Sequence, residues 1–452
     1  MCSINDDCGG QELMKGYQDL DTDDAKCRKC NENNATIKLR GKDNYCNECF
    51  LLSATHKFRA TLGKSKLVRP KDKVLVGYSG TAGSVALLNL IRAGMHESVH
   101  KRLVFESKVI YIDDGMLKKQ DLAQRQAFID QVRTQIKSLG FPGYVTSLSE
   151  CFNADSDVNV YKLDNYNCED NDDLNNLFDQ LTNDTAKQDL LKKLRYRLIA
   201  SAAKKLECGK VFLGDDATNL AVDILSNVAV GRGAQLAVDV GFVDDRFKNL
   251  MILRPMRDFT RVELDHYLNI HGLKTLDTAK VTKSSDPFAS IQQLTEDFIL
   301  DLESQFTGTV STVFRTGDKV CASKQSHNDN KSNDEICVIC NALMDTRSLD
   351  DATAIKATLF SRFISTQGIK SIVDVNVDDN YSEKSNCDNC QGDCFNSKDL
   401  TLQQLRKFLC YGCKLIFNYS FDCKKLPPHI TNKLREIICM QDMREQIKDF
   451  LL

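Results

Sequence analysis

Short apolar runs alternate with helical stretches from residue 74 onward. Runs typical of strands buried on both faces occur at Val74–Val76, Val109–Ile112, Tyr144–Thr146, Val211–Leu213 and Met251–Leu253. Helical spacing of apolar residues follows at Val85–Arg92, Leu117–Leu139, Leu190–Leu206 and Arg261–Ile270. This alternation predicts an α/β fold with a parallel sheet covered on both faces, whose ligands bind at the carboxyl ends of the strands.

The first strand leads into a loop of mostly small residues, Gly77–Ser84, and then into a helix. Backbone N–H groups at such a helix start point outward and suit an anion such as phosphate. Tight packing between strand and helix is an alternative reason for small side chains. The loop marks Ser79, Gly80 and Ser84 as candidate nucleotide-binding residues.

A pair of acids, Asp215 and Asp216, follows the strand at Val211–Leu213. At the carboxyl end of a strand, two carboxylates can hold Mg²⁺ or a ribose. A helix N-cap explains the same residues equally well. Both interpretations stay open at this stage.

Composition limits the class of protein. A chain of 452 residues with 42% apolar content can bury a large core and one or two further units. With a net charge of −3, nucleic acid would have to meet a local basic face or a partner subunit. The polar N-terminus is unlike a signal peptide, and no apolar run approaches the roughly 20 residues that span a bilayer, so we expect a cytoplasmic protein without a membrane partner.

Nineteen cysteines without a secretory signal favour metal thiolates over disulfides. Two C-x2-C pairs, Cys27/Cys30 and Cys46/Cys49, are separated by 15 residues, the spacing of a structural four-cysteine zinc site. A second site is expected from Cys337, Cys340, Cys410 and Cys413. The intervening Cys387, Cys390 and Cys394 can also contribute, because spacing does not fix the pairing.

Basic residues are concentrated in Thr55–Lys73, which has no acid before Asp72. A solvated helix face and a surface that follows an RNA backbone explain this run equally well. A later helix places Lys193 and Arg197 on one face. The candidate contacts with RNA phosphates are Lys57, Arg59, Lys64, Lys193 and Arg197.

The chain divides into four predicted parts: a polar tail over 1–24, an N-terminal zinc knuckle over 25–60, the α/β domain over 61–280, and a C-terminal region over 281–452 with the second zinc site and polar loops. An acidic segment at about 151–189 interrupts the α/β rhythm. It has little periodicity, so we expect a mostly solvated insertion.

Several segments occur in the order seen in the PP-loop ATP pyrophosphatase family, which the chain resembles over nearly its whole length. The matching segments are the twin knuckles, His56–Arg59, the loop at Ser79, Gly214–Asn219, Arg254–Pro255, Ser311–Asp318 and Leu409–Cys413. The resemblance implies an adenine nucleotide alpha hydrolase-like sheet flanked by two four-cysteine units.

The chain departs from the active members of that family. Their first loop reads S-G-G-x-D-S, where this sequence has Thr81 for the second Gly and Gly83 for the Asp. In the later G-H-N-x-D-D-x-A-E-T stretch, Thr218 and Asn219 replace the acids and Val222 replaces the Glu. The family's catalytic cysteines are also missing, with Thr182, Thr185 and Leu253 in their neighbourhood. Carboxylates for Mg²⁺ and thiolates for sulfur transfer are thus absent from the matched positions, and ATP binding stays open.

Within the family, the chain is similar to the non-catalytic subunits of the cytosolic complex that puts sulfur on C2 of the wobble uridine of tRNA Lys, Glu and Gln. That resemblance implies a heterodimer with a paralogous catalytic thiolase and sulfur from a thiocarboxylated ubiquitin-related modifier. Two other functions stay open. The chain can be an adenylating tRNA sulfurtransferase in its own right, or a zinc-dependent scaffold without RNA contact.

Overall fold

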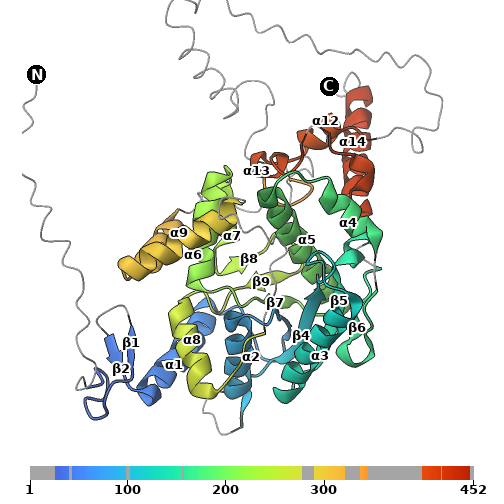
Figure 1. The fold of residues 1–452 in the computed structure, drawn as a ribbon. Helices are drawn as coiled ribbons and strands as arrows, with labels where there is room; N and C mark the ends of the chain where they lie inside the picture. Colours follow the sequence, from blue (N-terminus) through green and yellow to red (C-terminus); the bar gives the residue numbers. More distant parts are fainter. Residues whose placement is uncertain are drawn as a thin grey trace, which may run out of the picture.

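A seven-stranded sheet forms the centre of the molecule (Figure 1). The computed structural model describes residues 26–39, 43–97, 102–154, 157–169, 171–276, 290–320, 336–344, 400–418 and 420–447. In the order β6-β5-β4-β3-β7-β9-β8, the strands are β6 (Tyr161–Lys162), β5 (Gly143–Ser147), β4 (Glu106–Asp113), β3 (Lys73–Gly77), β7 (Lys210–Phe212), β9 (Met251–Leu253) and β8 (Val243–Asp244).

The five inner strands are parallel, and they are the five that the sequence predicts. Val76 of β3 is aligned with Val109 of β4 on one side and with Phe212 of β7 on the other. The two short edge strands, β6 and β8, run antiparallel and were not predicted. The parallel sheet and the two four-cysteine groups described below confirm the predicted fold class.

Helices cover both faces because successive strand residues point to opposite sides. Val74 and Val76 face a core shared with α1 (Asn47–Ser65), α2 (Ala82–Met95), α3 (Leu122–Ser138) and α8 (Arg261–His271). Leu75, between them in sequence, packs on the opposite face against α5 (Asp184–Lys205). All three side chains are fully buried.

Capping side chains explain where two predicted helices begin. The expected helix from Leu117 starts only at Leu122, because Asp121 accepts a hydrogen bond from the backbone N–H of Gln124 in a capping box. The expected helix from Leu190 starts earlier, after Asn183, whose side chain accepts from the N–H of Ala186 at 2.6 Å.

The acidic segment at 151–189 is mostly exposed or half-buried, as expected, but it has more regular structure and more buried side chains than its weak periodicity predicts. This segment forms η2 (Leu148–Phe152), η3 (Leu163–Asn165) and α4 (Asp172–Asp179) around β6. Leu174, Leu177 and Phe178 lie on one side of α4 and are buried, while the acids point outward. The helical spacing of three apolar residues therefore outweighs the acidic composition.

Two further helical groups complete the fold. In Figure 1, α9 (Ile291–Gln305) lies beside α6 (Ala217–Ala229), and these two share a small core with α10 (Thr309–Lys319). A turn that contains η4 (Gly233–Gln235) and α7 (Leu236–Asp239) leads from α6 towards the sheet edge.

The two cysteine-bearing ends attach differently. At the N-terminal end, β1 (Ile37–Leu39) and β2 (Asp43–Tyr45) form a hairpin beside α1. The C-terminal part forms α12 (Leu402–Lys407), α13 (Tyr411–Lys414), η7 (Cys423–Lys425) and α14 (Pro428–Ile447), which share a core with α4 and α5. The predicted domain boundaries stay predictions. The predicted tail and Cys387, Cys390 and Cys394 lie outside the described residues.

Candidate nucleotide cleft and metal centres

A cleft of about 560 Å³ opens at the carboxyl ends of β3, β4 and β7. Its walls come from the loops after these strands and from α5, α6 and α9. This is where a parallel sheet binds its ligands, as the sequence predicts. Of the five candidate nucleotide residues, Ser79 and Asp215 line the cleft, whereas Ser84 and Asp216 are buried beside it.

Hydroxyl groups of the loop after β3 bond to one another. Ser79 Oγ and Thr81 Oγ1 lie 2.9 Å apart, and Ser84 Oγ donates to the carbonyl oxygen of Thr81 at 2.9 Å. Gly80 has a φ of 80°, and its carbonyl accepts a 2.9 Å bond from the N–H of Leu276. A Cβ at Gly80 would lie 2.8 Å from Cβ of Leu276, so the chain after α8 covers this part of the loop.

The loops after β3 and β7 meet backbone to backbone. A Cβ built on Gly83 would collide with the carbonyl oxygen of Gly214, and a Cβ on Gly214 would lie 2.6 Å from the backbone nitrogen of Ser84. Position 83 is where active relatives carry an Asp. In this fold the space for such a side chain is filled by the Gly214 backbone.

The two adjacent acids have different environments. Asp215 accepts bonds from Arg254 Nε at 3.3 Å and from the Tyr196 hydroxyl at 3.4 Å. Asp216 is 3% exposed and is the N-cap of α6, where it accepts from the backbone N–H of Asn219 at 2.9 Å. Burial raises the pKa of Asp216 to about 6, although the Asn219 N–H favours its charged form.

The residues that replace family acids on α6 bond to a neighbouring helix. Thr218 Oγ1 accepts from the backbone N–H of Arg261 at 3.1 Å, and Asn219 Oδ1 accepts from Arg261 Nη2 at 3.0 Å. These side chains hold α8 against α6. They bring no negative charge to the cleft.

Every acid that lines the cleft within the described ranges forms an ion pair with a cation of the protein. The pairs are Asp114 with Lys118 and Arg195, Asp189 with Arg232, Asp215 with Arg254, Asp223 with Lys192, and Glu296 with Arg261. A carboxylate that is paired in this way would have to give up its partner to bind Mg²⁺.

None of the described cysteines lines this cleft. Near the family's catalytic cysteine positions, Thr185 Oγ1 accepts from the backbone N–H of Ile291 at 3.0 Å, and Leu253 is fully buried. Burial raises the pKa of Cys168 to about 11, which keeps this thiol protonated at neutral pH.

The N-terminal cysteines converge as the spacing predicts. All four sulfurs of Cys27, Cys30, Cys46 and Cys49 lie within 4.8 Å of one another, and those of Cys30 and Cys46 are 4.0 Å apart. Four thiolates around one zinc ion place their sulfurs about 3.8 Å apart. A backbone hydrogen bond from Cys30 lowers the pKa of Cys27 to about 6, whereas burial raises that of Cys49 to about 12, so full ionisation needs a cation.

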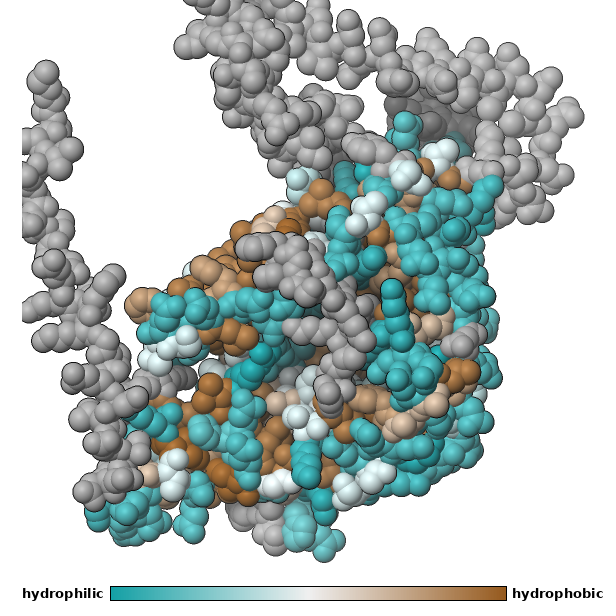
Figure 2. Space-filling view, viewed as in Figure 1, coloured by the Kyte–Doolittle hydropathy of each residue, from teal (hydrophilic) through white to brown (hydrophobic). Residues whose placement is uncertain are grey.

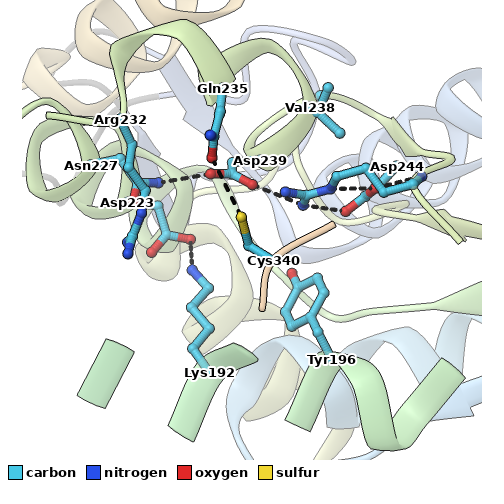
Figure 3. A network of polar contacts seen from close by, with 12 residues as sticks. Lys192, Tyr196, Asp223, Asn227, Arg232, Gln235, Val238, Asp239, Asp244 and Cys340 are labelled. Carbon is cyan, nitrogen blue, oxygen red and sulfur yellow. Dashed lines mark hydrogen bonds and ion pairs between the residues drawn. The ribbon is translucent and has the colours of Figure 1, made fainter. Parts of the chain in front are cut away.

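The C-terminal cysteines Cys337, Cys340, Cys410 and Cys413 also lie within 4.8 Å of one another, and all four are buried. The sulfurs of Cys340 and Cys410 are 3.7 Å apart. Figure 3 shows Cys340 reaching towards Gln235, whose Oε1 is 4.0 Å from the sulfur. The Gln235 amide nitrogen is buried without a hydrogen-bond partner in the described structure. Turning that amide over would aim an N–H at the sulfur, as a metal-bound thiolate requires.

Both cysteine groups use the same local turn. Asn31 and Asn341 each follow the second cysteine of a C-x2-C pair and adopt positive φ, at 57° and 55°. The N–H of each donates to the carbonyl oxygen of the first cysteine, Cys27 or Cys337. Cysteine spacing alone does not reveal this turn, whereas the Asn after the first pair of each group is a signal for it in the sequence.

The predicted tRNA contacts fall into different settings. Lys57 Nζ is 2.6 Å from Glu263 Oε1 and lies over the ring of Phe259, so its charge is used within the protein. Arg59 is half-buried on α1, and Lys64 is exposed near the end of that helix. On α5, Lys193 lines the cleft, and Arg197 lines a separate pocket.

The raised pKa of Asp216 predicts a pH-dependent effect of Asp216→Asn. The folded protein binds this proton more tightly than the unfolded chain, so its stabilising effect is lost as pH rises through about 6. Asn keeps the N-cap without the charge. Relative to the parent protein, the variant should gain about 1 kcal/mol in free energy of unfolding between about pH 5 and pH 7. Urea unfolding at both pH values measures this, and a constant difference would contradict it.

Comparison with known proteins places this architecture in one family. A model of the family "Cytoplasmic tRNA 2-thiolation protein 2" matches residues 290–415. The zebrafish (Danio rerio) protein of that name is 32% identical over 498 residues, covering 100% of this chain and 99% of its own. The Aedes aegypti protein is 32% identical over 94% of this chain and 100% of its own, and the human protein is 30% identical over 90% and 89%.

Among solved structures, a U34-tRNA thiolase, NcsA from Methanococcus maripaludis with its 4Fe-4S cluster, aligns with a TM-score of 0.49 and 17% identity, over 69% of this chain and 90% of that one. The full-length sequence matches decide the assignment. The chain belongs to the cytoplasmic tRNA 2-thiolation protein 2 family.

Proposed function

We propose that this chain is the non-catalytic subunit of the cytoplasmic complex that 2-thiolates the wobble uridine, 5-methoxycarbonylmethyl-2-thiouridine in its mature form, of tRNA Lys, Glu and Gln. A paralogous PP-loop thiolase is its partner and activates the uridine carbonyl. Sulfur comes from a thiocarboxylated ubiquitin-related modifier. Family membership supports the pathway, and the cleft supports the division of labour between the two subunits.

The observation that carries the non-catalytic role is the neutralised cleft. Adenylation needs a carboxylate-bound Mg²⁺ beside the phosphates, and sulfur transfer needs a thiolate nucleophile. Here the lining acids are all ion-paired, no described thiol lines the cleft, and the Gly214 backbone fills the space at position 83. The cleft keeps the shape of a nucleotide site without the groups that would react there.

Zinc is the proposed metal in both four-cysteine groups. Four soft thiolates at tetrahedral spacing suit Zn²⁺ and leave no open position for substrate. Its role here is to hold segments that are far apart in sequence.

The proposed tRNA face is the exposed part of the basic segment Thr55–Lys73, at the end of α1 and just after it. Lys64, Lys66, Arg69 and Lys71 are all exposed there. Lys57 is left out of this face because Glu263 already pairs with it. Charges that follow an RNA backbone contribute salt-dependent affinity without reading sequence.

A reconstituted thiolation assay tests the proposed role. We expect no 2-thiouridine from this chain alone with ATP, the sulfur-carrying modifier and tRNA, but full activity when the paralogous thiolase is added. The thiolase alone should be much less active. Thiouridine formation or ATP turnover by the isolated chain would instead identify it as a sulfurtransferase in its own right.

Metal content tests the zinc assignment. Elemental analysis of the purified chain should find two zinc ions per protein, and about one in a variant with Cys27→Ser and Cys30→Ser. Iron in place of zinc, or a single metal in the parent protein, would contradict the assignment.

Charge reversal tests the tRNA face. The double variant Lys64→Glu/Lys66→Glu should weaken tRNA binding by the complex. It should also make the negative slope of log affinity against log salt shallower by about 1–2, because each phosphate that is no longer neutralised reduces its magnitude by about 1. Lys204→Glu/Lys205→Glu, at the exposed end of α5, makes the same change in net charge and should have little effect. Filter binding over a salt series measures both. Equal losses in the two variants would show a non-specific charge effect, and no loss in either would remove α1 from the interface.

A further inference from the structure

The turn at residues 231–235 packs tightly against the residues between Cys410 and Cys413 of the C-terminal cysteine group. Gly231 has a φ of 75°, and a Cβ there would collide with the ring of Tyr411. On the other side, a Cβ at Gly412 would collide with the side chain of Arg232. The two residues between Cys410 and Cys413 therefore fit closely around this turn, with no room for a larger side chain on either glycine.

Arg232 lies between the C-terminal cysteine group and the cleft and contacts both. Its side chain is 2% exposed and forms a fork with Asp189 of α5, in which Nη1 donates to Oδ1 at 2.7 Å and Nη2 donates to Oδ2. The same Nη2 lies 3.9 Å from the sulfur of Cys413. Arg232 and Asp189 also line the cleft. One guanidinium thus contacts a candidate metal ligand and forms part of the cleft wall.

Electrostatic attraction between the metal-bound thiolates and nearby cations would stabilise this arrangement. Four thiolates around one divalent cation carry a net charge of about −2, which nearby cations and N–H donors stabilise. Besides Arg232, the cations Lys193 and Arg246 line the same small cavity as Cys340.

We propose that Arg232 is a positioning residue that links metal occupancy of the C-terminal cysteine group to the geometry of the cleft wall at Asp189. With metal bound, the thiolates and Asp189 hold the guanidinium from both sides, so α5 and the turn at 231–235 are fixed together. Loss of the metal frees the turn and then the adjoining end of α5. By linkage, anything that orders the cleft wall at Asp189 also increases the affinity of the C-terminal cysteine group for its metal. The link extends the proposed zinc role and does not depend on tRNA thiolation.

Arg232→Met in the full-length protein tests this link. The variant removes the donor and the charge while keeping an unbranched side chain. Chelator competition should show about 10–100-fold weaker binding of one zinc ion, as expected for loss of an outer-shell partner, with the N-terminal group unchanged as an internal control. Hydrogen exchange should lose protection at residues 184–193 and 230–236 and keep it in α1. Arg232→Lys should restore part of the metal affinity, because it keeps a cation near the thiolates.

Arg406→Met is the matched control. Arg406 is in the same C-terminal part, and its Nη2 donates to the carbonyl oxygen of Phe417 at 2.9 Å. This change should leave zinc affinity and exchange at 184–193 as in the parent. If Arg232→Met does not fold, Asp189→Asn loosens the fork at nearly constant volume and should give the same local loss of protection.

Three results would overturn the proposal: unchanged zinc affinity in the Arg232→Met protein, equal weakening in the Arg406→Met protein, or uniform loss of protection across the whole chain. A parent protein that binds only one zinc ion would overturn both this link and the proposed second zinc site. Two zinc ions with no effect of Arg232→Met would overturn the link alone.

Discussion

Buried charges must be paired, and in this protein that requirement connects the sheet edge, the cleft and the C-terminal cysteine group. Figure 3 shows Asn227 beside the carboxylate of Asp239, to which its Nδ2 donates at 3.4 Å. Nη2 of Arg246 forms ion pairs with both Asp239 and Asp244. Arg254, 1% exposed, then joins Asp244 to Asp215 at the cleft. Removing one member would leave an uncompensated charge, at a cost of about 3–5 kcal/mol. The elements that carry these residues are thus fixed relative to one another even though β8 and β9 are very short.

The same pairing occupies the carboxylates that line the cleft. Lys192 pairs with Asp223, and Arg254 pairs with Asp215, so cations of the protein neutralise these two carboxylates. Figure 2 shows hydrophilic and hydrophobic side chains mixed over the visible surface, where teal and brown atoms alternate. These pairs join α5 to α6 and the loop after β9 to the loop after β7, so they preserve the shape of the cleft.

Sequence patterns predicted the parts of this structure that depend on local order. The run Met251–Leu253 is a strand with those bounds, and four thiols spaced as in Cys27–Cys49 converge. The patterns failed where distant contacts decide. The acidic composition did not predict the buried side of α4, because three apolar residues, among them Leu174, are enough to pack this helix against the core. Nor does any local signal reveal that Gly83 faces Gly214, since these loops meet only through the sheet.

Two cysteine groups with one ligand set and one turn geometry have different surroundings. Among the described residues, the N-terminal group forms a small cluster of its own with Tyr45 of the hairpin, and Cys30 is half-buried. The C-terminal group lies in a core that contains Leu190 and Leu194 of α5, with Arg232 beside its sulfur. The folding energy that a bound metal supplies is distributed through the residues that pack against its ligands, so a metal in the first group would stabilise a local hairpin. A metal in the second group would act on a core that includes α5 and, through Arg232, on the wall of the cleft.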